Sequence, residues 1–192
     1  IIDLEKNIDE VFSNFNSTCR KHIRRFEKID ELFLHKNILD NNEFYEFYSN
    51  CERSRGWLPI PEKEFFNSII FYVTYMGFPI SGISAYICDN KIRMGRIFSI
   101  RNKTKIDNAN LIFGVAAKKL VFEFCIYAKE NNFKFIDLGG IDLTSDQKSG
   151  ISKFKLSFTD KVVPVKIGRY VKPPKNYFEL NSSFKKEEFD LT

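Results

Sequence analysis

Three short runs rich in β-branched and aromatic residues, with tight turns between them, place the strongest limit on what this chain can fold into. The runs are Ile69 to Tyr75, Ile80 to Cys88 and Lys91 to Ile100. Met76 to Pro79 and Asp89-Asn90 separate them, and loops this short join antiparallel neighbours. The sequence therefore predicts a three-stranded antiparallel meander between residues 68 and 100.

Helical patterns lie on both sides of this meander. Apolar residues recur at helical spacing in several segments, most of which begin at a residue that can cap a helix. The predicted helices are Asp3 to Phe15, Thr18 to Lys28, a segment after Asn41-Asn42, a short one after Pro61 and a long one from Leu111 to Glu130. The predicted further strands are Glu31 to His35, Lys134 to Leu138 and Val162 to Val171. Helices that flank a mostly antiparallel sheet indicate an α/β (α+β) fold.

The length of 192 residues, 43% of them hydrophobic, predicts a single domain over residues 1–172. A polar tail over residues 173–192 is expected after Pro173-Pro174. Because the chain begins at Ile1, it is expected to be a fragment of a longer protein. No apolar run approaches the roughly 20 residues that cross a bilayer.

Four widely spaced cysteines and two histidines give no metal-binding pattern, so no metal is expected. Free thiols are typical of a reducing cytoplasm, which is the expected location. The formal charge of +5 favours an anionic ligand, and phosphate-bearing small molecules satisfy it as well as nucleic acid does.

Two basic segments could meet such an anion. Arg20 and Arg24 share one helix face at i,i+4 spacing, where like charges repel, so either an anion compensates them or the face is simply solvated. Arg101 and Lys103 precede the long helix, whose first turn offers unpaired N–H groups and the positive end of the helix dipole.

The segment from Phe135 to Phe158 contains the main candidate for catalysis. Its strand stops at Gly139-Gly140, where the backbone can bend sharply. After Gly150, apolar residues at positions 151, 154 and 158 predict a short helix. Lys155 lies beside this apolar stripe, so its ammonium could project along a cleft; the alternative is a solvated surface lysine.

Four motifs, in this order, resemble the FemAB-type branch of the GNAT acyltransferase superfamily, over about residues 18 to 165. They are the basic helix from Cys19 to Lys28, the helix Glu43 to Tyr48 followed by Arg53-Ser-Arg55-Gly56, the strand end Phe135 to Gly140, and Gly150-Ile-Ser-Lys-Phe154-Lys155. The branch includes peptidoglycan aminoacyltransferases and single-domain N-acyltransferases. The resemblance implies a GNAT-like fold with a central meander flanked by helices.

The sequence also departs from these families. The usual pyrophosphate-binding signature at the start of the long helix is reduced to Leu111-Ile-Phe-Gly114-Val-Ala116, which lacks its leading Gln or Arg. Ile136 replaces a tyrosine in the strand motif, and Thr159 replaces a glycine. The peptidoglycan enzymes have two such domains and this chain has one, which favours a small acyl donor over aminoacyl-tRNA.

The resemblance implies a bacterial, cytoplasmic N-acyltransferase that moves an acyl or aminoacyl group from an activated thioester or ester, with acyl-CoA favoured, to an amine. The acceptor would be a cell-envelope precursor, an amino sugar or a nucleotide-linked amine. The alternatives are an aminoacyl-tRNA-dependent enzyme and a non-catalytic module that binds RNA or another anion. A third is an inert half of a larger enzyme.

The candidate residues follow from these roles. Lys155 would stabilise the oxyanion or grip an acceptor phosphate, and Asp142 would accept the amine proton. The substrate-binding candidates are Arg20, Arg24, Arg96 and Asp137, the last of which also suits a structural role at the strand end. The donor-binding candidates are Arg101, Lys103, Gly114 and Ala116.

Overall fold

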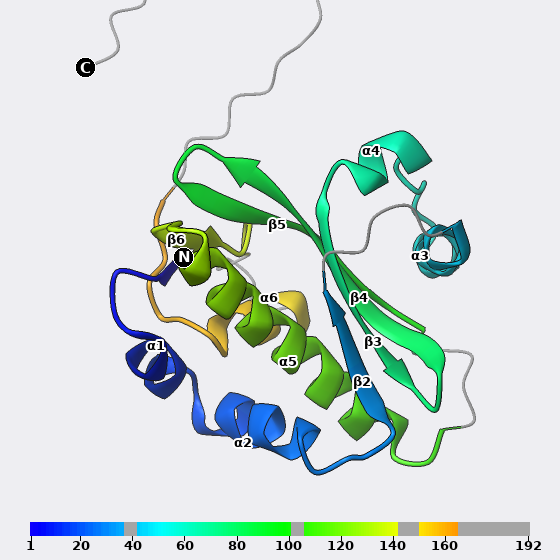
Figure 1. Cartoon of the computed structure of the whole chain (residues 1–192), viewed down its shortest axis with the longest axis horizontal. Helices are drawn as coiled ribbons and strands as arrows, with labels where there is room; N and C mark the ends of the chain where they lie inside the picture. The colour runs from blue at the N-terminus through cyan, green and yellow to red at the C-terminus, as the bar shows by residue number, and fades with distance from the viewer. Residues whose placement is uncertain (37–41, 101–105, 142–149, 165–192) are drawn as a thin grey trace, which may run out of the picture. The chain divides into compact units, whose positions relative to one another are not determined.

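The computed structural model describes residues 1–36, 42–100, 106–141 and 150–164 (Figure 1). The chain divides into a compact unit Ile1–Val162 and a second unit Val163–Thr192, of which only residues 163 and 164 are described. The boundary predicted at residue 172 and most of the strand predicted over residues 162–171 lie outside the described residues, so both stay predictions. The described helices and strands all belong to the first unit.

Six strands and six helices make up the described part of this unit, and Figure 1 labels them. The strands are β1 Ile2–Asp3, β2 Leu32–Lys36, β3 Ile69–Tyr75, β4 Phe78–Cys88, β5 Lys91–Ser99 and β6 Phe135–Asp137. The helices are α1 Ile8–Asn14, α2 Ser17–Phe26, α3 Asn42–Ser54, α4 Glu62–Phe66, α5 Ala109–Glu130 and α6 Gly150–Leu156. None of these helices is both long enough and apolar enough to span a bilayer.

The strands form one sheet in the order β1-β6-β5-β4-β3-β2. All neighbours are antiparallel except β5 and β6, which are parallel. The meander predicted from the three runs is β3-β4-β5, and its turns fall where the sequence placed them. The predicted mixed, mostly antiparallel sheet is therefore confirmed.

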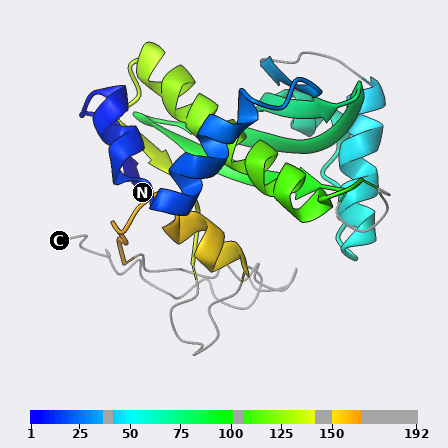
Figure 2. The same ribbon diagram turned by 90° about the horizontal axis from the view of Figure 1, so that it is seen from below.

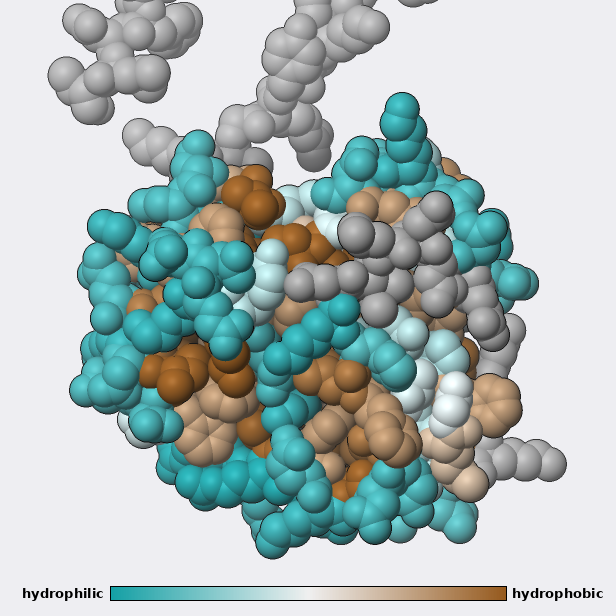
Figure 3. All heavy atoms as spheres, viewed as in Figure 1, coloured by the Kyte–Doolittle hydropathy of each residue, from teal (hydrophilic) through white to brown (hydrophobic). Residues whose placement is uncertain are grey.

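Helices cover both faces of the sheet. On one face α5 packs with α1 and α2 over a large core that includes Phe71, Leu120 and Phe124 (Figures 1 and 2). On the other face α3 and α4 enclose a second, mostly aromatic core around Phe44 and Phe98. In the view of Figure 3, hydrophilic residues cover much of the surface, with patches of hydrophobic residues between them.

The prediction of a helix from Asp3 to Phe15 is wrong at its start. The helix begins at Ile8, because the side chain of Asn7 caps it by accepting the Glu10 N–H at 2.8 Å. The residues before this cap extend the sheet instead: Ile2 pairs with Ile136 of β6. Ile2 and Leu4 are buried by strand alternation, whereas the spacing of Leu4 and Ile8 had suggested a helix.

An ion-pair network around one buried carboxylate joins three elements on the α5 side. Glu123 of α5 is 6% exposed and binds Lys36 of β2 at 2.5 Å and Lys119 of α5 at 2.9 Å. Lys119 also binds Glu27, which follows α2. Burial opposes ionisation of Glu123, but the hydrogen bonds from the two lysines outweigh it and lower the pKa of this carboxyl.

This network should make the free energy of unfolding depend on pH in the acid range. Because the pKa of Glu123 is lowered in the folded state, its contribution is complete above the ordinary value of 4.5 and is lost as the pH falls through the lowered pKa. We therefore expect Glu123→Gln to flatten the pH dependence of the urea unfolding midpoint below about pH 4.5. If the unchanged protein and the variant lose stability in parallel between pH 5 and pH 3, the network does not contribute in this way.

Candidate active site

The site lies where two neighbouring strands of the sheet separate. β5 and β6 pair over three residues each: Lys91–Arg93 of β5 lie beside Phe135–Asp137 of β6. β6 ends there because the chain turns away at Gly139, whose φ of +76° is in the left-handed region that favours glycine. In the described part of the chain, β5 continues to Ser99 without a partner on that side.

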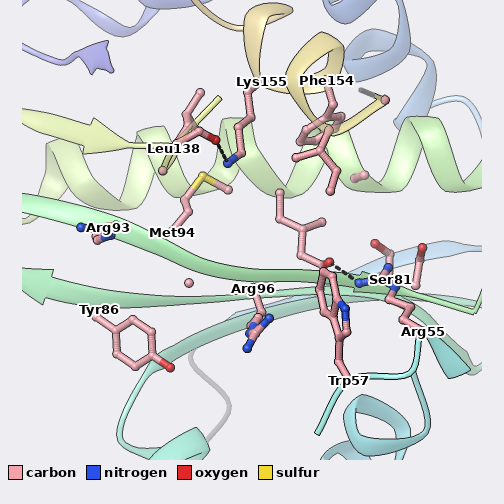
Figure 4. Close-up of a pocket in the computed structure, with 18 of the residues that line it drawn as sticks. Arg55, Trp57, Ser81, Tyr86, Arg93, Met94, Arg96, Leu138, Phe154 and Lys155 are labelled. Atoms are coloured by element: carbon pink, nitrogen blue, oxygen red, sulfur yellow. Dashed lines mark hydrogen bonds between the residues drawn. The ribbon is translucent and has the colours of Figure 1, made fainter. Parts of the chain in front are cut away.

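A cavity of about 740 Å³ occupies this gap. Its walls are β5, the bend at Gly139-Gly140, α6, the middle of α5 at Ala117, and the segment that follows α3 (Figure 4). Four cationic residues line it, and no acidic residue does so among the described ones. The cationic residues are Arg55, Arg93, Arg96 and Lys155. The cavity is large enough for a small-molecule substrate.

Lys155 projects from α6 toward the bend at the end of β6 (Figure 4). Its ammonium donates a hydrogen bond to the carbonyl oxygen of Gly140 at 2.8 Å. The bend is held by Asp137, whose carboxylate accepts the N–H of Gly139 at 2.8 Å. A Cβ on Gly139 would lie 3.3 Å from the Lys155 Nζ. The glycine therefore supplies both the positive φ and room for the lysine.

Burial lowers the pKa of Lys155; Asp137 opposes this shift and Arg93 adds to it. Asp137 in turn lies 4.0 Å from the Arg93 guanidinium. Met94, Leu138 and Phe154 supply apolar surface on the same side of β5 as Lys155. A cation beside an apolar wall suits the carbonyl of an acyl group, on which negative charge develops during transfer.

The opposite wall is aromatic and strongly basic. Arg55, Trp57, Tyr86 and Arg96 lie on the other side of β5 from Lys155 (Figure 4). The guanidinium of Arg96 lies 5.3 Å, and that of Arg55 5.9 Å, from the centre of the Trp57 ring. The cavity thus offers two chemically different ends.

A β-bulge in β5 produces these two ends. Ser84 of β4 pairs with Arg96, and the next residue, Ala85, pairs with Met94, so Gly95 is an extra residue in β5. Residues two apart on a regular strand share a face, but this insertion sends Met94 to the α5 side and Arg96 to the α3 side. The ring of Tyr86 packs so closely over Gly95 that a Cβ there would overlap it.

Comparisons with solved structures find proteins of similar fold. FemX superposes with a TM-score of 0.61 at 13% identity, over 81% of this chain and 56% of FemX. L-PGS from Bacillus licheniformis gives 0.53 at 13% identity, over 78% of this chain and 46% of L-PGS. The aminoglycoside acetyltransferase meta-AAC0020, from an uncultured soil metagenomic sample, gives a TM-score of 0.53 at 12% identity, over 76% of this chain and 98% of the acetyltransferase.

The chain has a GNAT-like fold. This confirms the fold that the four motifs implied. No protein-family model matches the sequence, and a search of curated proteins finds no match either. The chain spans about half of the length of FemX and of L-PGS.

The GNAT-like fold brings two of the predicted site residues into the cavity, Lys155 and Arg96, from opposite sides of β5. Asp137 does not line the cavity but fixes the bend beside it. Asp142, Arg101 and Lys103 lie outside the described residues. Their proposed roles therefore stay predictions.

The other predicted residues lie away from the cavity. Arg20 donates to the carbonyl oxygens of Ser13 and Phe15, and the Arg24 guanidinium lies 5.2 Å from the centre of the Phe12 ring. Gly114 faces His22 of α2, and Ala116 is buried in the α5 core. None of these four residues lines the cavity.

Sequence reasoning missed several residues of the basic wall. Arg55 belongs to a motif that resembled the FemAB-type enzymes, and Trp57 follows that motif, but neither received a role. Tyr86 of that wall and Arg93, which also lines the cavity, lie on predicted strands but received no role either. Gly95 was the available signal, because a glycine inside a strand pattern often marks a bulge.

Proposed function

We propose that the chain is an N-acyltransferase that transfers an acyl or aminoacyl group from an activated thioester or ester to an amine, with acyl-CoA as the favoured donor. The observation that carries the proposal is the cavity at the strand separation, with Lys155 beside apolar surface at one end and a basic aromatic wall at the other. The shared fold with FemX and an aminoglycoside acetyltransferase supports it.

The chemistry follows from the two ends. The acyl carbonyl would lie on the side of Met94 and Leu138, with its oxygen near the Lys155 ammonium. The amine nitrogen forms a bond to the carbonyl carbon, and the C–S or C–O bond to the donor breaks. Lys155 stabilises the negative charge that is larger in the transition state than in the substrate. The proton lost by the amine would pass to Asp142 or to water.

The acceptor would be an amine on a cell-envelope precursor, an amino sugar or a nucleotide-linked molecule, which agrees with the positive charge of the cavity. A CoA pyrophosphate would bind at the N–H groups at the start of α5, with Arg101 and Lys103 adding charge. Gly114 faces His22 and Ala116 is buried, so neither is assigned to this contact. Aminoacyl-tRNA remains the alternative donor.

A mass-spectrometric screen of acyl-CoAs and aminoacyl-tRNAs against amine acceptors tests this function. We expect at least one acyl-CoA to give an N-acylated product that depends on the protein. Product from aminoacyl-tRNA alone would change the donor and keep the reaction class. Steeply salt-dependent RNA binding with no turnover of any pair would contradict the proposal and favour a non-catalytic module.

A further inference from the structure

Two arginines from different elements meet at one buried carboxylate in the basic wall. Arg55 follows α3, Arg96 lies on β5, and one nitrogen of each lies 3.5 Å from an oxygen of Glu52. Arg55 also donates to the carbonyl oxygen of Ile97 at 3.0 Å. Both guanidinium groups lie against the ring of Trp57.

Glu52 is fully buried, and neither of its carboxylate oxygens accepts a hydrogen bond in the described part of the chain. A buried carboxylate without hydrogen bonds is costly, and burial accordingly raises its pKa, which Arg96 and Arg55 partly offset. Its position between the guanidinium groups has a clear effect: it holds two like charges side by side that would otherwise repel each other.

The open side of this pair faces the cavity. The side chains of Arg55 and Arg96 are 32% and 37% exposed, and both residues line the cavity wall. The Arg96 guanidinium makes no hydrogen bond to another described side chain, and its nearest charged partner is Glu52 at 3.5 Å. Two guanidinium groups against one carboxylate leave a net positive charge, and no described residue that lines the cavity is acidic.

We infer that Arg55 and Arg96 form a subsite for a phosphate group of the acceptor. Each guanidinium can donate two parallel hydrogen bonds to an oxyanion, so the pair matches the several oxygens of a phosphate better than the two of a carboxylate. The acceptor class is then an amine that carries a phosphate. A polycationic amine is disfavoured, since like charges facing each other in a site reduce affinity.

The attribution of this phosphate to the acceptor rests on the proposed function, whereas the anion site itself does not. Equilibrium dialysis with radiolabelled pyrophosphate measures the site without turnover. Trp57 is the only tryptophan of the chain and lies against both guanidinium groups, so its fluorescence reports where the anion binds. We expect saturable binding together with a saturable change in Trp57 emission.

Arg55→Ala and Arg96→Ala, tested separately, should each weaken pyrophosphate binding about tenfold to a hundredfold, the effect of one charge-assisted hydrogen-bonding group. Arg53→Ala is the matched control, because Arg53 is an exposed residue of α3 that does not line the cavity. Circular dichroism verifies that each variant folds, and one folded arginine variant suffices for the test.

Three results would overturn the inference: no saturable binding, an equal loss in Arg53→Ala, or acetate that competes as well as phosphate does. The first would leave the acyl-transfer proposal standing, because an acceptor without phosphate could still react. Conversely, a failed acyl-transfer screen would leave the anion site standing.

Discussion

Replacing Lys155 with methionine is expected to lower turnover about a hundredfold to a thousandfold, the usual effect of removing one oxyanion-stabilising donor. Lys155 lines the cavity, and the bend held by Asp137 fixes the carbonyl oxygen to which its ammonium donates. Methionine keeps the stem and removes the charge. The fold should survive, because Gly140 is exposed and water can replace the lost hydrogen bond.

The measurement uses the substrate pair that the screen identifies, with turnover and KM determined separately. A loss confined to turnover marks an interaction made in the transition state, whereas a rise in KM alone marks acceptor binding. Lys153→Met is the internal control, because Lys153 lies on the same helix but is exposed and does not line the cavity. Equal activity in the two variants would return Lys155 to the role of a surface lysine.

The meander and most helices could be predicted from the sequence, because alternation, tight turns and caps are local signals. The N-terminal segment could not be. Ile2 is buried only because β6, more than a hundred residues later, lies beside it, and no local pattern reveals that partner. Leu4 and Ile8 mimic a helical stripe although a cap at Asn7 separates them. The pairing of this segment with β6 therefore makes it a strand and not the first turn of a helix.

Lys155 and Arg96, two of the candidates named from the sequence, line the cavity, but the sequence could not show which wall each would occupy. Arg96 faces α3 because of one extra residue, Gly95, and a strand pattern without its partner's register does not show that shift. Arg20 and Arg24 of the basic helix α2 lie away from the cavity, and their predicted role in substrate binding stays a prediction. Arg24 packs over Phe12, a contact that depends on how α1 and α2 meet.

The register of β5 against β4 also places Phe98 in the aromatic core between the sheet and α3. Phe98 of β5 is fully buried, and its ring centre lies 5.0 to 6.1 Å from those of its neighbours on α3 and α4. These neighbours are Phe44, Phe47, Tyr48 and Phe65. Opposite Phe98 in the sheet is Gly82, where a Cβ would lie 2.5 Å from the Phe98 ring. The glycine makes room for the phenyl ring.

Phe98→Ala should therefore lower the free energy of unfolding by about 3–5 kcal/mol, measured by urea denaturation, because it leaves a cavity that rigid rings cannot fill. Phe78→Ala, at a 74% exposed position on β4, should cost less than about 0.5 kcal/mol. Gly82→Ala alone should cost about 1–3 kcal/mol by overpacking against the Phe98 ring. Added to Phe98→Ala, it should cost little more, because the methyl group then enters the space that the ring has left. Strictly additive costs in this double-mutant cycle would show that the two residues do not compete for that space.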